Sequence, residues 1–439
     1  MTIRMDEGAA ELLDTLHRAG YAAYVVGGCV RDSLLGLTPH DWDLCTSALP
    51  QQVMELFGAQ RCIPTGLQHG TVTVKQSGAL YEITTFRTEG TYTDGRHPDE
   101  VHFVLDVRED LARRDLTINA MAYNEKEGLV DPFGGQADLQ SGIVRAVGVP
   151  RQRFTEDALR ILRLYRFAAR FGFAIDPPTA QAAQELCAHL DCVSVERIEE
   201  ELAKLLSAPA PAAYLNEKIL GVVLPELSPE ALAAAKPVVD ACPAGAENLP
   251  VRLAALLLSL GEDGIRRTLK RLRCSNALIE EAAVLVREAR GCDGSFLFGH
   301  DSGHSIASPS AFGNRVPPQR TVLRETTVTP GFTIYARRLL GKYNLCTVQR
   351  IAALGTALQP EHAADFAALS ELAEQLDADG VCCRVSQLAV NGRDLMAAGV
   401  PAGPGIRKVL EALLDGVIRE EYPNERQALL AAVQQLAAS

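Results

Sequence analysis

A glycine pair followed by two closely spaced aspartates constrains this chain more than any other segment. Residues 24–45 read YVVGGCVRDSLLGLTPHDWDLC, with Gly27 and Gly28 after an apolar run and then Asp41 and Asp43. A strand at DWDLC would project both aspartates from one face, because side chains alternate with a period of two. Adjacent carboxylates repel each other unless a cation lies between them. The pair therefore predicts a Mg²⁺ site, since both ligands are hard oxygens with no His or Cys beside them.

The glycine pair predicts a place for phosphate groups next to that metal. Gly27 and Gly28 allow the backbone to approach a phosphate chain closely, and a helix after them would point its N-terminus at the same anions. Arg31 lies where it can reach a triphosphate, and Asp32 can hold the turn or pair with Arg31. A metal beside bound phosphates indicates nucleotidyl or phosphoryl transfer.

Strand and helix patterns divide the chain into two kinds of structure. Before residue 150 they predict an α+β head, a mixed sheet with flanking helices, and after Pro150 an almost wholly helical array. The predicted strands are 22–26, 41–45, 71–75, 81–87 and 101–105, and the predicted head helices are 6–18, 30–36, 50–57 and 110–122. Residues 88–99 predict a loop. Residues 291–333, rich in Gly, Ser, Thr and Pro, predict an irregular insertion in the helical half.

Length and composition limit the setting in which the chain works. Its 439 residues suffice for about three domains. The 11 cysteines are scattered and include no CxxC pair, so a reducing, cytoplasmic compartment is expected. The apolar run at 253–260 is too short to span a membrane, and we expect no membrane anchor.

The overall charge and its local distribution point in opposite directions. The net charge of −12 argues weakly against a nucleic-acid partner. Three segments are nevertheless basic: 139–170, 264–275 and 313–350. A basic track on an acidic protein is the interpretation that these runs favour over solvated helix faces.

Two further segments in the head carry candidate active-site groups. Glu82, on a strand predicted beside the aspartates, is the best candidate for the third carboxylate that two-metal nucleotidyl transfer usually requires. RRDLTINAMAY at 113–123 places Arg114 where it could neutralise phosphate. In the same segment, Asp115 or Asn119 could accept a hydrogen bond from a ribose hydroxyl.

The segment FTEDALRILRLYRF at 154–167 predicts how a base is recognised. On one helix, Asp157, Arg160, Arg163 and Arg166 recur every three residues and form a polar stripe. An Asp and an Arg on adjacent turns present an acceptor beside a bidentate donor. Cytosine and adenine each carry an amino donor next to a ring-nitrogen acceptor, so this set matches their Watson–Crick edges. Such a protein could select its nucleotide without a template.

Taken together, these motifs resemble the class II tRNA nucleotidyltransferases, or CCA-adding enzymes, of the polymerase-β-like nucleotidyltransferase superfamily. The resemblance rests on GGCVRD with DWD, EITTFR at 82–87, RRDLTINA at 113–120, DPFGGQADL at 131–139, EDALRILRLYRF at 156–167 and ERIEEELAKLL at 196–206. NGRDLMAAGVPAGPGIRKVL at 391–410 resembles the C-terminal region of shorter bacterial members.

The resemblance implies a reaction, substrates and roles for individual residues. It implies addition of CCA to tRNA from CTP and ATP, with Mg²⁺ on Asp41 and Asp43. Gly28, Arg31 and Arg114 would contact the nucleotide, Asp157 and Arg160 would read its base, and Arg163 and Arg166 would support that helix. The implied domains are a head (1–150), a neck (151–210), a body (211–350) and a tail (351–439).

The same motifs leave other functions open. A bacterial poly(A) polymerase shares the head and neck, although such enzymes tend to carry an Arg-rich stretch where this chain has GLQHGTVTVKQSG. An enzyme that adds only CC or only A is a third possibility, because such enzymes differ from CCA-adding enzymes by subtle changes in the loop and the C-terminal half. An inactive RNA-binding protein of the same fold is a remote alternative, because both aspartates and the base-reading pair are present. The segment at 253–264 lacks the His-Asp pair of a phosphohydrolase domain, so no phosphatase activity is expected.

Overall fold

A computed structural model of the chain describes residues 3–90, 100–291, 322–323, 326–327 and 330–437. The chain forms two compact units. The first comprises residues 1–236, 244–246 and 271–274, and the second comprises 237–243, 247–270 and 275–439. None of the described helices combines the length and hydrophobicity that crossing a bilayer requires.

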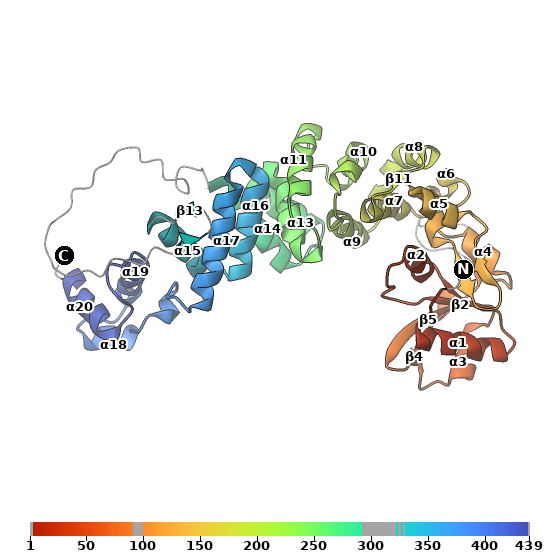
Figure 1. Cartoon of the computed structure of the whole chain (residues 1–439), viewed down its shortest axis with the longest axis horizontal. Helices are drawn as coiled ribbons and strands as arrows, with labels where there is room; N and C mark the ends of the chain where they lie inside the picture. Colours follow the sequence, from red (N-terminus) through yellow and green to blue (C-terminus); the bar gives the residue numbers. More distant parts are fainter. Residues whose placement is uncertain (1–2, 91–99, 292–321, 324–325, 328–329, 438–439) are drawn as a thin grey trace. The chain divides into compact units, whose positions relative to one another are not determined.

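A mixed sheet of seven strands forms the centre of the first unit (Figure 1). Its order is β3-β4-β5-β2-β1-β8-β9, and of its neighbouring pairs only β2 and β5 run parallel. The strands are β1 (Ala23–Val26), β2 (Leu44–Thr46), β3 (Cys62–Gly66), β4 (Thr71–Gln76), β5 (Ala79–Thr85), β8 (Ala122–Asn124) and β9 (Gly128–Val130). The pairs β6 (Arg87–Glu89) with β7 (Val101–Phe103) and β10 (Ile143–Val144) with β11 (Ala174–Ile175) lie outside this sheet. This arrangement confirms the predicted α+β head.

Helices surround the sheet and then continue the first unit. They are α1 (Glu7–Arg18), α2 (Gly28–Leu34), α3 (Pro50–Phe57), α4 (Val107–Ala112), α5 (Gly135–Ser141), α6 (Pro150–Glu156), α7 (Leu159–Phe171), α8 (Pro177–Glu185), α9 (Val195–Leu206) and α10 (Glu217–Val223). Helices α1 and α3 pack against sheet strands (Figure 1). A buried cluster that includes Tyr24, Cys45 and Phe86 joins β1 and β2 to α4, so the strands that carry the candidate site stand on a continuous apolar core.

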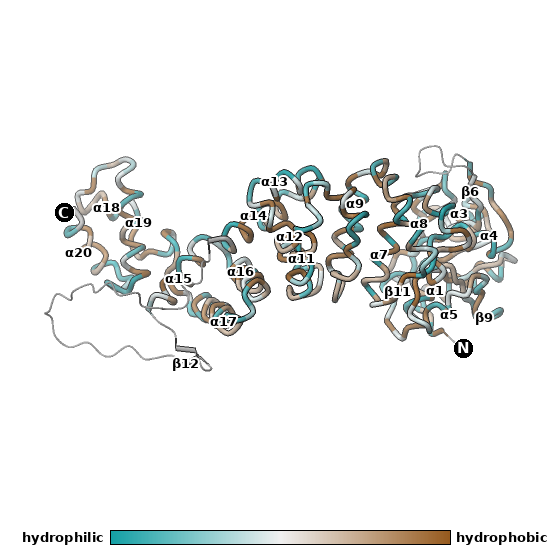
Figure 2. Tube along the Cα trace, turned by 90° about the horizontal axis from the view of Figure 1, so that it is seen from above, coloured by the Kyte–Doolittle hydropathy of each residue, from teal (hydrophilic) through white to brown (hydrophobic). Residues whose placement is uncertain are grey.

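The second unit is built from helices. They are α12 (Leu249–Leu257), α13 (Gly261–Arg271), α14 (Asn276–Gly291), α15 (Pro330–Lys342), α16 (Leu345–Leu358), α17 (Ala363–Ala378), α18 (Gly392–Ala397), α19 (Pro404–Ile418) and α20 (Arg426–Ala437), with the short strands β12 (Val322–Leu323) and β13 (Thr326–Thr327). The boundary between the units falls within α11 (Pro229–Ala241) at Pro237, and Arg271 at the end of α13 belongs to the first unit. Hydrophobic and hydrophilic segments alternate along these helices (Figure 2), as expected of amphipathic helices.

The bounds of several predicted elements differ from those in the structure. The strand predicted at 41–45 begins only at Leu44, and Gly291 and residues 330–333 of the predicted insertion are helical. The helix predicted at 110–122 stops at Ala112, because Leu116 pairs with Ala146 and the Thr117 hydroxyl donates to Asp138. The helix predicted across 154–167 breaks at Asp157, whose φ of −146° and ψ of 105° are extended. In each of the last two segments tertiary contacts outweigh helical periodicity. Most of the insertion, and residues 91–99 of the predicted loop, lie outside the described residues.

A fully buried arginine ties two segments of the second unit together. Arg252 on α12 is 0% exposed, and its guanidinium donates to the carbonyl oxygens of Cys242 at 3.0 Å and Pro243 at 2.9 Å. These carbonyls follow the C-terminal end of α11, where helical carbonyls lack intrahelical partners. We expect Arg252→Met to lower the free energy of unfolding by about 1–3 kcal/mol, because buried acceptors lose their donor. Urea unfolding measures the change, with Arg267→Met on the exposed face of α13 as control. Equal midpoints for the two variants would contradict this account.

Candidate active site

Two of the candidate carboxylates, Asp43 and Glu82, come from the place where β2 begins beside β5. The parallel register pairs Leu44 with Ile83 and Cys45 with Thr84, so continuing it back by one residue sets Asp43 opposite Glu82. Asp43 also accepts a backbone hydrogen bond from Val26 of β1 at 2.9 Å, which fixes the chain just before β2. Asp41 and Asp43 therefore precede the strand rather than belong to it. All three carboxylates are exposed to solvent.

The electrostatics of Asp43 show that these acidic groups affect one another. Desolvation by the surrounding protein raises the pKa of the Asp43 carboxyl, and the negative charges of Glu82 and Asp41 raise it further. The Arg114 guanidinium acts in the opposite direction. Within the described part of the chain, no three His, Cys, Asp or Glu side chains are already gathered into a metal-binding group. Asp41, Asp43 and Glu82 thus lie within electrostatic range without forming a closed ligand set.

Gly27 brings the backbone of α2 close to Arg114. Gly27 has a φ of +76° and precedes α2, and a Cβ there would lie 3.0 Å from Nη1 of Arg114. Arg114 is held from the other side by Asp110, which accepts from its Nη2 at 3.3 Å. Its Nε is buried and has no hydrogen-bond partner within the structure. A cation with an unused donor therefore lies so close to the backbone at Gly27 that a side chain there would crowd it.

Arg31 lies deeper than the sequence suggested. It is 4% exposed, its Nε donates to Asp32 at 2.7 Å, and its Nη1 donates to Asn119 at 2.5 Å. Its guanidinium also lies 5.0 Å from the ring of Phe167 and 5.2 Å from that of Phe171, both on α7. Several of its donors are thus committed to protein groups. The predicted contact of Arg31 with a triphosphate stays a prediction.

Asp115 and Asn119 form a buried polar link between the head and α7. Asp115 accepts from Asn119 at 3.2 Å and from Nε of Arg163 at 2.7 Å. Burial alone would raise the pKa of Asp115, but the nearby Arg163 and Arg160 guanidinium groups outweigh it and hold the pKa below its usual range. Both oxygens of Asp115 are used, because its Oδ1 also accepts the Leu116 amide at 2.8 Å. The structure therefore gives these residues internal partners, and the predicted ribose contact stays untested.

The residues predicted to read a base flank the break between α6 and α7. Asp157 accepts the Leu159 amide at 3.1 Å, which starts α7, and it pairs with Arg197 on α9 at 2.8 Å. Arg160 is 9% exposed and donates to Glu156 at 2.8 Å and to the Arg113 carbonyl oxygen at 3.1 Å. Arg166 lies 2.7 Å from Glu201 of α9. Burial lowers the pKa of Arg166 to about 10, against the opposing effect of Glu201.

Internal ion pairs account for the first of the three basic runs. Each of its seven arginines pairs with a carboxylate of the first unit, so part of its charge is compensated internally, and the basic track stays a prediction. The pairs are Arg145 with Asp138 and Asp176, Arg151 with Glu185, Arg153 with Glu156, Arg160 with Glu156, Arg163 with Asp115, Arg166 with Glu201, and Arg170 with Asp32. The sequence could not reveal these ion pairs, because most of the partner carboxylates are distant from the arginines along the chain.

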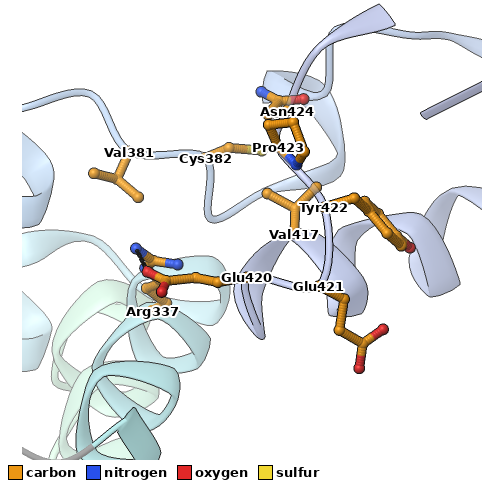
Figure 3. Close-up of a pocket in the computed structure, with 9 residues that line it drawn as sticks. All are labelled: Arg337, Val381, Cys382, Val417, Glu420, Glu421, Tyr422, Pro423 and Asn424. Carbon is orange, nitrogen blue, oxygen red and sulfur yellow. Dashed lines mark hydrogen bonds and ion pairs between the residues drawn. The ribbon is translucent and has the colours of Figure 1, made fainter. Parts of the chain in front are cut away.

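A separate pocket in the second unit has a volume of ≈ 490 Å³ (Figure 3). Arg337 lines it and donates to the Ile418 carbonyl oxygen at 3.2 Å and to Glu420 at 2.8 Å. Glu420 has a φ of +60°, so this pair holds a strained turn after α19. None of the residues predicted to act in catalysis lines this pocket.

One residue near the predicted base-reading residues was not predicted from the sequence. It is Arg197, which lies in the first unit and pairs with Asp157.

Comparisons with known proteins match three parts of this chain to described families. Residues 23–145 match the poly A polymerase head domain, 172–230 the probable RNA and SrmB-binding site of polymerase A, and 332–433 the tRNA nucleotidyltransferase domain 2. The chain is 34% identical to the CCA-adding enzyme of Lactiplantibacillus plantarum over 97% of its own length and 95% of that protein.

Solved structures share the fold over nearly the whole chain. The CCA-adding enzyme of Bacillus stearothermophilus in complex with CTP is 30% identical, with a TM-score of 0.77 over 99% of this chain and 98% of that one. The Thermotoga maritima CCA-adding enzyme complexed with tRNA_CCA is 20% identical, with a TM-score of 0.67 over 99% and 97% of the two chains. The second likeness supports the fold alone.

The contact between Gly27 and Arg114 can be tested by adding one methyl group. Gly27→Ala places a Cβ against Arg114 and strains a backbone with positive φ, at a cost of about 1–2 kcal/mol in stability. Gly20→Ala is a matched control, because Gly20 has a φ of +88° but nothing within 4 Å of its Cβ position. We expect both variants to lose a similar amount of melting temperature. Only Gly27→Ala should also lose catalytic rate. Equal rates for both variants would show that the approach to Arg114 is unimportant.

Proposed function

This chain belongs to the class II CCA-adding enzymes, a family of tRNA nucleotidyltransferases, and we propose that it adds CCA to the 3′ end of tRNA from CTP and ATP without a template. The carrying observation is Asp43, which lies opposite Glu82 at the start of β2 and feels the charges of Glu82, Arg114 and Asp41, with Arg114 close to Gly27. Its relative solved with CTP supports the nucleotide substrate, and the curated CCA-adding enzymes that it resembles support tRNA as the acceptor. Head (1–150), neck (151–210), body (211–350) and tail (351–439) remain our proposed domains.

The donor set fits Mg²⁺. Asp41 and Asp43 offer hard oxygen ligands. Desolvation and then the charges of Glu82 and Asp41 raise the pKa of Asp43, and a bound cation would offset this cost of its negative charge. Asp41 and Asp43 would hold the metal, and Glu82 would help from the adjacent strand. When bound, a pair of Mg²⁺ ions would make the tRNA 3′ hydroxyl a better nucleophile and stabilise the leaving pyrophosphate.

The remaining site residues bind and orient the nucleotide. Arg114, with its unused Nε, would neutralise phosphate, and Gly27 and Gly28 would leave room for the phosphate chain beside it. Asp157 would accept a hydrogen bond from the exocyclic amino group of C or A, while Arg160 would donate to the ring nitrogen. Arg31, Asp115, Asn119, Arg163 and Arg166 would hold these groups in place through the buried contacts that they make with one another and with α7 and α9.

The length of the product tests the substrate and the reaction. The protein is incubated with Mg²⁺ and a tRNA that ends at its discriminator base, with CTP, ATP or both. We expect two residues to be added with CTP alone and three with both nucleotides, followed by a stop. A long A tail would identify a poly(A) polymerase. No product with any nucleotide would overturn the proposed activity.

The two aspartates are tested by removing their charges together. We expect a variant with Asp41→Ala and Asp43→Ala to lose nucleotide incorporation by at least about a hundredfold, because no ligand pair then holds the metal. Binding of tRNA, measured by filter retention, should be unchanged. Asp14→Ala, which removes an exposed carboxylate of α1 from its pair with Arg18, is the control and should retain full activity. Retained incorporation in the double variant would overturn the metal assignment.

A further inference from the structure

Helix α9 contacts Asp157, one of the two predicted base-reading residues. Its residue Arg197 forms a two-pronged contact with Asp157, from Nη2 to Oδ2 at 2.8 Å and from Nη1 to Oδ1 at 3.3 Å. Both side chains are largely shielded, with 24% of Arg197 and 15% of Asp157 exposed. A fork of this kind fixes the plane of a carboxylate as well as its position.

Asp157 needs such a partner because helical geometry does not orient it. It lies in the extended residue between α6 and α7, and its neighbour Leu159 donates a backbone hydrogen bond to Oδ1 at 3.1 Å. That single bond would still allow the carboxylate to rotate. The second prong from Arg197 reaches Oδ2, so the two oxygens are held in distinct places. Oδ2 has one described partner and keeps a free lone pair.

Arg197 is itself fixed by the packing of α9 on α7. Helices α7 and α9 pack along each other (Figure 2). One turn after Arg197, Glu201 is 4% exposed and lies 2.7 Å from Arg166 and 3.7 Å from Arg163, both on α7. Residues four apart lie on one helix face. The same face of α9 therefore engages Asp157 at one point and the α7 arginines at the next.

We infer that Arg197 is a specificity-determining positioning residue, which holds Asp157 as a fixed acceptor so that bases with an amino group are selected. The inference rests on the proposed reading of the base by Asp157. An ionised carboxylate only accepts hydrogen bonds, so it matches N4 of cytosine and N6 of adenine. It repels O4 of uracil and O6 of guanine, which are also acceptors. A carboxylate that can turn away loses both the attraction and the repulsion.

Discrimination between nucleotides tests this inference. Arg197→Met removes the fork while keeping a chain of similar length, and Arg197→Lys keeps a positive charge without the fork. Lys204→Met, on the exposed part of α9 where Lys204 pairs with Glu200, is the matched control. For each protein, kcat and KM are measured for CTP against UTP at the first added position, and for ATP against GTP at the third. Melting temperatures confirm folding.

We expect Arg197→Met to lower the CTP to UTP ratio of kcat/KM by roughly tenfold or more, with a partial recovery in Arg197→Lys and wild-type ratios in Lys204→Met. The loss should appear as better use of UTP, whereas a merely structural role would lower the rates with both nucleotides equally. If Arg197→Met does not fold, Arg197→Lys takes its place, and an unchanged CTP to UTP ratio of kcat/KM in that variant would overturn the role of Arg197.

The variant Asp157→Ala distinguishes base reading by Asp157 from the positioning role of Arg197. If Asp157→Ala reduces the ratio and the Arg197 variants do not, the role of Arg197 is overturned and base reading by Asp157 stands. If Asp157→Ala leaves the ratio unchanged, the proposed base reading fails, and the role of Arg197 fails with it. In either case the product-length experiment still judges CCA addition independently.

Discussion

The buried contact between Asp115 and Arg163 is the constraint on which the candidate active site depends. Asp115 comes from the loop after α4, and Arg163 from α7, so their 2.7 Å contact joins the head to the helix that carries the base-reading residues. Removing one member of a buried ion pair typically costs about 3–5 kcal/mol, because the other charge is left uncompensated. Asn119 extends the contact to Arg31, and Arg31 to Asp32. A continuous set of buried polar contacts thereby joins α2 to α7.

The chemistry predicted for this site stays a prediction, whereas its predicted local geometry can be compared with the structure. Asp41, Asp43 and Glu82 were expected to come together because one strand pattern carries the aspartates and another carries the glutamate. The register of β2 and β5, continued by one residue, sets Asp43 opposite Glu82. The same reasoning put the aspartates inside a strand. Pairing of β2 begins only at Leu44, which leaves them in the preceding segment, where they are open to solvent. Periodicity indicates which residues share a face, but it does not fix where pairing starts.

Long-range partners explain the other differences. The sequence analysis interpreted the stripe Asp157, Arg160, Arg163 and Arg166 as groups that read a base, because spacing alone says nothing about carboxylates elsewhere in the chain. Asp115 precedes the stripe by many residues and Glu201 follows it, yet both pair with it, and Asp32 pairs with Arg170 near the end of α7. Arg197 was missed for the same reason: on α9 it is one charge among many, and only the fold brings it to Asp157. Contacts between helices far apart in sequence leave no local signal.

These contacts bear on how a protein can replace a nucleic-acid template. A template base presents donors and acceptors on a rigid plane, whereas a side chain such as Asp157 rotates unless something holds it. The fork from Arg197 supplies that rigidity on one side, and the Leu159 amide supplies it on the other. Arg160 is held similarly by Glu156 and the Arg113 carbonyl. Selection of C and A would then depend less on the identity of Asp157 and Arg160 alone than on the second layer of side chains that keeps both in fixed positions.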